Sequence, residues 1–398
     1  MRTHLYLCLT LVFVSLFARA DGGFFNKSLT IAHSADQRAI LIRDRAAGME
    51  TMVLSTMYDG TLAEYGWVIP VPNLPTREQV TTMPASYVFN ELDAQTAPRV
   101  RITSSASCGS GCGASAGDAA GEVLAPGDVQ EVDHFTTGNV EITTLNAGSG
   151  QALTDWLATN GFQFPASGQD ILQCYVAKNW GFVAAKMTPT LVQGSSRQQP
   201  GEFFPDQLLA LTFRTDTLVF PLRISAVSSR ADDNEVLLYV FDAHRVTATN
   251  MATAEMEFTV GAKAVGEDTF QQRYDKAFAQ QARQEGKPVL LVEYGALASL
   301  PDSLRSFSRQ LFYLTRLRTR LNVGDMTDDL LFTDAPTDAP FRISVSAPRL
   351  PLQAGSLLLP VATLIALLRR RIHRIALRRA LTESLLLMIL IMLMVGWL

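Results

Sequence analysis

The sequence predicts an α+β fold of mostly antiparallel sheets with inserted helices, followed by a C-terminal transmembrane helical hairpin. Three observations lead to this prediction. Short segments rich in Val, Leu, Phe and Tyr recur along the chain, only a few segments between them have helical spacing, and two long apolar segments stand at the C-terminal end. The 398 residues, 47% hydrophobic and 18% charged, suffice for one large or two ordinary domains and exclude a wholly disordered chain.

Residues 1–20 have the pattern of a secretory signal peptide. Arg2 supplies a positive charge, Leu5 to Phe17 is an apolar run of 13 residues, and Ala18-Arg19-Ala20 is an A-x-A cleavage site. The alternative is an uncleaved membrane anchor, but this run is short for a membrane span. We therefore expect cleavage after Ala20 and an exported domain that lies in the periplasm or at the cell surface.

The stretch Tyr58–Pro72, YDGTLAEYGWVIPVP, is the expected structural anchor of the exported domain. Trp67-Val68-Ile69 favours a pleated and half-buried surface, so we expect a strand in which Trp67 is structural. Proline cannot donate to a strand ladder, so Pro70 and Pro72 indicate a strand end or a sheet edge.

The other elements follow from apolar spacing and turn residues. The predicted strands are Ser28–Ile31, Gln37–Arg45, Met49–Met57, Arg99–Thr103, Val129–Phe135, Val140–Leu145, Trp180–Met187, Gln207–Arg214, Val219–Ala226, Glu235–Val246, Pro288–Tyr294 and Phe312–Leu321. The predicted helices are Ala85–Ala94, Gly150–Thr159, Gln169–Lys178 and Phe270–Glu285. Thr136-Thr137-Gly138-Asn139 should turn a hairpin, while Ser149 should cap the second helix and Asn160-Gly161 should end it.

Residues 104–127 are rich in Gly, Ala and Ser and indicate a flexible loop. A phosphate-binding glycine loop would need a Gly-Lys-Ser/Thr end, and this stretch has no lysine. Cys108 and Cys112 lie in this loop, where export and a glycine-rich spacer favour a disulfide. Cys174 would then remain as a buried thiol in an apolar helical context.

The net charge differs sharply between the exported domain and the chain ends. The whole chain has 34 basic and 38 acidic residues, a net charge of −4. The ends contribute Glu383 and eight arginines, namely Arg2, Arg19, Arg369, Arg370, Arg371, Arg374, Arg378 and Arg379. Without them, residues 21–368 hold 26 basic and 37 acidic residues, a net charge of −11. An acidic domain lacks the basic surface that nucleic acid requires, so we expect no nucleic-acid partner.

No pattern of catalytic, cofactor-binding or metal-binding residues stands out. The histidines show no zinc-type spacing, and no Gly-x-Ser-x-Gly motif occurs. Acidic turns at 232–235 and 325–329 do not match a calcium-loop register. We expect no cofactor and no metal. A Ser/His/Asp triad stays open as an alternative, because its members are neighbours in space and not in sequence.

The C-terminus predicts two membrane spans. Residues 350–368 form a stretch of 19 residues without charge, residues 369–380 hold six arginines, and residues 381–398 are again apolar after Thr382-Glu383-Ser384. About twenty apolar residues cross a bilayer, and positive loops stay cytoplasmic. The expected hairpin therefore has both ends outside the cytoplasm. The alternative is one span followed by a basic amphipathic segment on the inner leaflet.

These pieces together resemble the bacterial exported family called domain of unknown function 2330. The similarity covers about residues 21–335, with 336–349 as a linker, and rests on ordered blocks such as Trp67-Val68-Ile69-Pro70-Val71-Pro72, Thr96-Ala97-Pro98-Arg99 and Phe220-Pro221-Leu222-Arg223-Ile224. Its signature positions are Tyr58, Gly60, Trp67, Pro70, Pro72, Pro98, Arg99, Trp156, Pro221, Arg223 and Arg316. Relatives often begin with Cys-Gly-Gly-Phe-Phe-Cys, and residues 21–26 here lack both cysteines.

The resemblance implies an exported and often membrane-attached bacterial protein with no assigned chemistry. We expect a binding or assembly module of the cell envelope that contacts the lipid bilayer through its C-terminal hairpin and has an envelope protein as a possible partner. The alternative is an envelope hydrolase with a dispersed catalytic site. An enzyme should gather polar side chains with displaced pKa values in one pocket, whereas a binding module should expose an apolar or aromatic patch.

Overall fold

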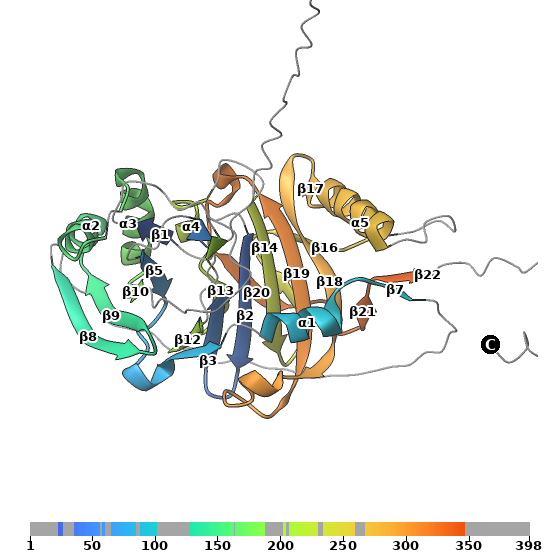
Figure 1. Ribbon diagram of the computed structural model, residues 1–398, viewed down its shortest axis with the longest axis horizontal. Helices are drawn as coiled ribbons and strands as arrows, with labels where there is room; N and C mark the ends of the chain where they lie inside the picture. Colours follow the sequence, from blue (N-terminus) through green and yellow to red (C-terminus); the bar gives the residue numbers. More distant parts are fainter. Residues whose placement is uncertain are drawn as a thin grey trace, which may run out of the picture. The chain divides into compact units, whose positions relative to one another are not determined.

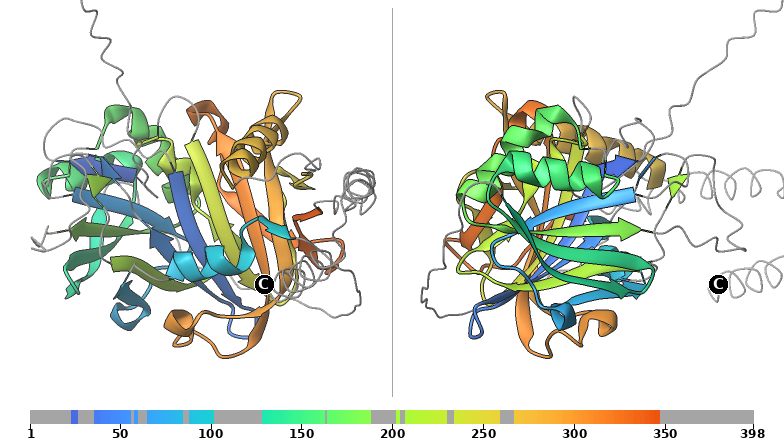
Figure 2. Two further views of the ribbon diagram at one scale, coloured as in Figure 1. Left: turned by 45° about the vertical axis from the view of Figure 1, so that its right-hand side comes forward. Right: turned by 90° about the vertical axis from the view of Figure 1, so that its left-hand side faces the viewer.

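The computed structural model describes residues 23–26, 36–55, 58–59, 65–84, 88–101, 128–162, 164–187, 202–203, 207–229, 234–258 and 267–346 (Figures 1 and 2). The chain divides into two compact units, Met1–Ala347 and Pro348–Leu398, and every described residue belongs to the first. This unit is a mixed α/β structure with mostly antiparallel sheets and few helices, so the fold class predicted for residues 21–335 is confirmed at this level.

A large sheet forms the centre of the unit. Its strand order is β16-β18-β19-β14-β2-β3-β12-β6, and β17 and β21 also pair with β18. The bounds are β2 Asp36–Asp44, β3 Met49–Ser55, β6 Val80–Pro84, β12 Gln207–Arg214, β14 Asn234–Asp242, β16 Ala252–Glu255, β17 Arg283–Gln284, β18 Lys287–Ser299, β19 Leu311–Leu321 and β21 Phe341–Arg342. Only the pairs β14–β2 and β16–β18 are parallel.

A smaller sheet has the order β1-β5-β10-β9-β8 and is antiparallel throughout. Its strands are β1 Gly23–Asn26, β5 Tyr65–Val71, β8 Val129–Thr137, β9 Val140–Ala147 and β10 Gly181–Met187. Helices α2 (Gly150–Thr159) and α3 (Gln169–Ala177) cover one of its faces, where Leu153 and Leu172 pack with Phe182 of β10. Figure 1 shows both helices beside β8 to β10.

The main core lies between the two sheets. Side chains from β2 and β3, such as Leu41 and Met52, cluster with Trp67 and Ile69 of β5 and Val183 of β10. Trp67 is 1% exposed, as the structural role expected for it requires. Because this one core collects residues from about position 39 to position 332, the two sheets form one folded unit.

The other face of the large sheet is covered by two helices. Helix α1 (Val88–Thr96) packs Val88, Phe89 and Leu92 onto β2, β14 and β19, and α5 (Glu267–Gln281) packs Tyr274 and Phe278 onto β18. The remaining elements are short: β4 Tyr58–Asp59, β7 Arg99–Arg101, β11 Glu202–Phe203, β13 Leu218–Phe220, α4 Leu222–Ser225, β15 Val246–Ala248, β20 Leu330–Asp334, β22 Ser344–Ser346 and the 3-10 turns Arg77–Gln79, Ala166–Gly168, Asp302–Leu304 and Val323–Asp325.

Pro70 corrects the expectation of a sheet edge. Strand β5 lies inside the small sheet, and Pro70 faces Phe182 of β10. On the other side of β5, the pairing with β1 among the described residues runs from Tyr65 to Val68. Pro70 therefore has its described strand partner on the β10 side, within two residues of the end of β5. The expected strand end is confirmed, since β5 stops at Val71, just before Pro72.

Most predicted elements are present, and the main error falls at Pro221. The strand expected over Val219–Ala226 ends at Phe220, and the buried Pro221 caps the short helix α4 instead. Proline has no N–H for the ladder and its fixed φ suits a helix start. The strand expected over Glu235–Val246 divides into β14 and β15, and the strand expected at Pro288 extends to Ser299 as β18.

Several expectations lie outside the described residues. They are the signal peptide at 1–20, the strand at 28–31, Gly60, the loop at 104–127 with Cys108 and Cys112, and the segments 350–368, 369–380 and 381–398. Within the described part of the chain, no helix combines the length and apolarity that crossing a membrane requires. Cys174 is a free thiol, as predicted, but it is half-buried rather than buried.

Candidate functional site

A pocket of about 310 Å³ lies on the helix-covered face of the small sheet, where the sheet extends past α2. We call it the β8–β10 pocket. It is lined by Glu131, His134, Glu141, Thr143, Trp156, Asn160, Phe162, Ala184 and Lys186. Its volume falls within the roughly 300–1,000 Å³ that small-molecule sites occupy.

The strand register sets the floor of this pocket. Lys186 of β10 lies opposite Glu141 of β9, and Thr143 of β9 lies opposite His134 of β8. Directly opposed residues of antiparallel strands project from the same face, and alternate residues of one strand share that face. The pleat therefore brings Lys186, Glu141, Thr143 and His134 together.

The end of α2 makes the pocket wall. Ser149 begins the helix, its side chain accepting a hydrogen bond from Ala152 N at 3.1 Å, and Asn160 ends it as predicted. Gly161 has a φ of +83°, a conformation that glycine adopts readily, and it turns the chain back so that Phe162 reaches the sheet. Gly66 leaves room for this ring, because a Cβ there would lie 1.6 Å from Phe162 Cδ1.

Polar contacts orient the lining side chains. His134 Nδ1 lies 3.0 Å from Thr143 Oγ1, and His134 Nε2 lies 3.3 Å from Glu141 Oε1. Trp156 donates its indole N–H to Glu131 Oε1 at 2.6 Å. The pocket thus offers carboxylate acceptors, the Lys186 ammonium and an aromatic ring to a small polar ligand. Within the described ranges, no three His, Cys, Asp or Glu side chains are grouped so that they could hold a metal ion.

Several displaced pKa values lie elsewhere, in a buried ion network on the large sheet. Arg316, Arg318 and Arg320 alternate along β19 and share one face. Arg316 binds Glu293 (2.7 Å) and Asp93 (2.6 Å), and Arg318 binds Glu235 through two bonds of 2.8 and 2.7 Å. Tyr239 and Tyr274 donate to Asp93 and Glu293.

The network is held in its charged form. Burial by itself would raise the pKa of Asp93, but Arg316, the Tyr239 hydroxyl and Arg38 together outweigh it, and the pKa of Asp93 is lowered. In the same way, Arg318 and Arg320 together outweigh burial and lower the pKa of Glu235. Arg316 is only 5% exposed, so this network joins α1 to the sheet and offers no open site.

Two further buried carboxylates also serve the fold. Asp329 accepts hydrogen bonds from the Tyr175 hydroxyl, from Lys178 Nζ at 3.1 Å and from Arg223 N at 3.2 Å, which ties α3 and α4 together. Glu50 accepts from Val219 N at 3.1 Å, and burial raises its pKa to about 8.

The signature positions predicted from the sequence do not gather in one place. Only Trp156 lines the β8–β10 pocket. Trp67, Pro70, Pro221 and Arg316 are buried, and Pro72, Pro98 and Arg223 are half-buried. Tyr58 and Arg99 lie in β4 and β7, and Gly60 lies outside the described residues.

His134, Glu141 and Lys186 were not predicted as site residues from the sequence. A signal existed for the first two, because the predicted turn at Gly138-Asn139 sets His134 opposite Thr143 and places Glu141 on the same face. Lys186 had no such signal, since two helices, α2 and α3, separate β10 from β9 along the chain.

Comparison with known proteins adds family membership and no chemistry. The profile of the family described as "Uncharacterized protein conserved in bacteria (DUF2330)" matches residues 18–333. No curated protein matches the chain.

Solved structures with a detectable likeness include the crystal structure of baculovirus P35, at 11% identity and a TM-score of 0.30, covering 76% of this chain and 96% of that one. Another is a mutated baculovirus P35 after caspase cleavage, at 10% identity and a TM-score of 0.32, covering 77% and 99%.

Proposed function

The chain belongs to the DUF2330 family of uncharacterized proteins conserved in bacteria, and from this premise we propose that it is a membrane-anchored, extracytoplasmic binding protein of the cell envelope. We further propose that its ligand is a small polyhydroxylated molecule, such as a sugar, held in the β8–β10 pocket. One observation carries the proposal: carboxylates, an ammonium group, an amide and an indole ring line the same pocket.

These groups suit a ligand with several neighbouring hydroxyls. Glu131 and Glu141 can accept hydrogen bonds from hydroxyl groups, while Lys186 and Asn160 can donate to hydroxyl oxygens. Trp156 offers an apolar ring whose N–H is already bound to Glu131. A ligand that satisfies both the donors and the acceptors avoids leaving buried polar groups unpaired.

The geometry supports binding over catalysis. Glu131 lies opposite Leu145, four residues from Glu141 along β9, so about 13 Å of strand separates their backbone positions. The Glu131 carboxylate accepts from the Trp156 indole N–H, whereas Glu141 Oε1 lies 3.3 Å from His134 Nε2, so the two carboxylates have different side-chain partners. The backbone of β9 is paired with β8 and β10 on both sides, so its N–H groups do not converge on an oxyanion site beside Thr143.

A hydrolase remains the second candidate because Thr143, His134 and Glu141 stand in the order of a nucleophile, a base and an orienting carboxylate. Thr143 is only 7% exposed, which restricts its access to a substrate. Hydrolysis of p-nitrophenyl acetate by the protein, abolished by Thr143→Ala, would favour this candidate. The binding proposal predicts the same slow background rate of hydrolysis with the wild-type protein and with Thr143→Ala.

Isothermal titration calorimetry of the full chain with a panel of mono- and disaccharides tests the binding proposal. Glu141→Gln and Lys186→Met should each weaken the best sugar about tenfold, because each removes one charge-assisted hydrogen bond. The matched controls are Glu91→Gln and Lys276→Met, both exposed on other elements. Equal affinities in the site variants and the controls would exclude this pocket, and no heat with any sugar would reject the ligand class.

The proposed membrane anchor is supported by the apolar segments 350–368 and 381–398 and by the arginines between them. In a chain without native cysteines, a membrane-impermeant thiol reagent should label a cysteine placed after Leu398 but not one replacing His373. Labelling at position 373 in intact cells would overturn the topology. Export is supported by the A-x-A site, and an N-terminus at Asp21 in the mature protein is the expected mass-spectrometric result.

The proposed Cys108–Cys112 disulfide is supported by export and by the glycine-rich spacer. Mass mapping of unreduced peptides should find the two cysteines linked, and free thiols at both positions in exported protein would reject the bond. Its effect on stability should be small because the closed loop is short.

A further inference from the structure

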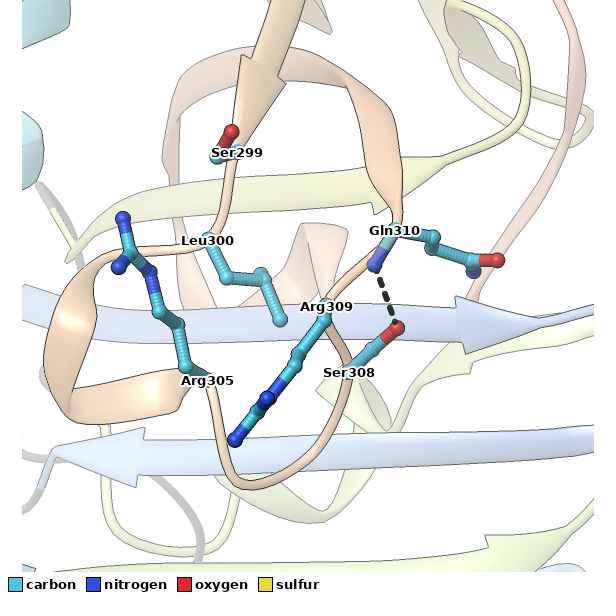
Figure 3. A pocket seen from close by; sticks show the side chains of 6 residues that line it. All are labelled: Ser299, Leu300, Arg305, Ser308, Arg309 and Gln310. Carbon is cyan, nitrogen blue, oxygen red and sulfur yellow. Dashed lines mark hydrogen bonds between the residues drawn. The ribbon is translucent and has the colours of Figure 1, made fainter.

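A second pocket, of about 470 Å³, lies at the end of the β18–β19 hairpin (Figure 3). We call it the hairpin-end pocket. It is lined by Ser299, Leu300, Arg305, Ser308, Arg309 and Gln310, with no acidic side chain. Figure 3 shows Arg305 and Arg309 on the connecting loop, with their side chains running in opposite directions in this view. Two guanidinium groups and two hydroxyls at one pocket are donors suited to an anion.

The loop that carries these arginines is well packed. Leu300 and Leu304 are 2% and 0% exposed and belong to the core cluster beneath α1. Backbone bonds from Leu304 N to Pro301 O (2.9 Å) and from Phe307 N to Leu304 O (3.0 Å) close two turns. The arginines therefore stand on an ordered frame, which lowers the entropic cost of binding a ligand.

The charges of these arginines are weakly neutralised within the protein. Arg305 contacts Asp302 at 2.9 Å, but the two side chains are 58% and 81% exposed, and such surface pairs contribute little. Among the described residues, Arg309 has no carboxylate partner. This is notable in a domain whose net charge is −11 over residues 21–368. Solvent-accessible guanidinium groups remain available to an external anion.

Two leucines add an apolar surface beside the arginines. Leu297 and Leu311 are 63% and 60% exposed, and with Val132 they are the only large apolar side chains exposed in the described part of the chain. Leu311 lies opposite the pocket residue Ser299, and Leu297 precedes Ser299 by two residues on the same face of β18. Clustered exposed leucines in a soluble surface mark an interaction site.

We propose that the hairpin end binds an anionic amphiphile, with its phosphate group bound by the guanidinium groups of Arg305 and Arg309 and its apolar chain on Leu297 and Leu311. A lipid headgroup and a soluble phosphate ester share this chemistry. This site lies on the large sheet, apart from the β8–β10 pocket, and does not depend on the sugar-binding proposal.

Calorimetric titration of the full chain in nonionic detergent with hexyl phosphate, inorganic phosphate and 1-hexanol tests the proposal. Hexyl phosphate should bind about tenfold more tightly than inorganic phosphate, since burial of about two methylene groups gives that ratio. Hexanol, which lacks the anion, should give no saturable heat. A preference for hexyl phosphate over inorganic phosphate supports the proposal of an anionic amphiphile. Equal binding of both phosphates would limit the site to small soluble anions and refute that proposal.

Matched variants separate the two parts of the site. The double variant Arg305→Gln/Arg309→Gln should bind inorganic phosphate and hexyl phosphate at least tenfold more weakly. The control Arg273→Gln, exposed on α5, should change neither affinity. The double variant Leu297→Ser/Leu311→Ser should bind hexyl phosphate only as tightly as inorganic phosphate. The control Val132→Ser, at a side chain 52% exposed on β8, should keep the preference for hexyl phosphate. Unchanged binding in the double-arginine variant would refute the site, and its melting temperature shows whether it is folded.

Discussion

Arg316→Met is the perturbation that most directly tests the buried ion network. Methionine has a similar length and no charge, so the change removes the guanidinium with little loss of volume. Glu293, which is 0% exposed, would keep only the Tyr274 hydroxyl and Arg318 Nη1 at 3.6 Å. Asp93 would keep Arg38 at 3.3 Å and the Tyr239 hydroxyl.

The expected loss of unfolding free energy is about 3–5 kcal/mol, the usual cost of removing one partner of a buried ion pair. The matched control is Arg305→Met, the same substitution at an exposed pair, for which about 0.2–1 kcal/mol is expected. The loss should also depend on pH. The pKa of Asp93 is lowered below its ordinary 3.8, so its ion pairs stabilise the fold above that pH and are lost as the pH falls through the folded pKa.

Urea titrations at pH 7 and pH 3, followed by near-ultraviolet circular dichroism, measure these differences. The deficit of Arg316→Met relative to the wild type should be large at pH 7 and smaller at pH 3. A deficit no larger than that of the control at pH 7 would refute the view that this network holds α1 on the sheet. A deficit that stays constant between the two pH values would show that lost packing, not charge, is responsible.

Three further predictions concern single positions. Burial raises the pKa of Glu50 from 4.5 to about 8, so the folded protein keeps a proton that the unfolded chain releases, and stability should fall between about pH 4.5 and 8. Glu50→Gln should remove that part of the pH dependence. At pH 8 the variant should be more stable than the wild type by several kcal/mol, since each unit of pKa shift corresponds to about 1.4 kcal/mol. Parallel profiles of stability against pH for the two proteins would contradict this. Gly66→Ala should lower the unfolding free energy by roughly 1–3 kcal/mol, because the new Cβ would clash with the Phe162 ring. Adding Phe162→Ala to the same chain should relieve this clash. Purely additive losses in the double-mutant cycle would show that positions 66 and 162 do not interact. Trp67→Ala should lower the unfolding free energy by about 3–5 kcal/mol, since the indole is 1% exposed, and an unchanged melting temperature with lost ligand binding would make Trp67 a recognition residue.

Local signals in the sequence were sufficient for many elements. Helix α2 has the predicted bounds Gly150–Thr159, because its cap at Ser149 and its stop at Asn160-Gly161 involve contacts within a few residues. The hairpin of β8 and β9 was predicted for the same reason. The strand expected across Pro221 was wrong because its apolar pattern continues past the proline, and only burial beside α3 shows that the segment turns there.

The sequence by itself determined the fold class of the family domain, the family and most element positions, since these depend on residue spacing and order along the chain. The tertiary structure alone decided the sites. The β8–β10 pocket joins Lys186 to Glu141 across 45 positions, and the network joins Arg316 to Asp93 across 223. No local pattern marks such pairs, because sheet register and the packing of two sheets on one core set their distances.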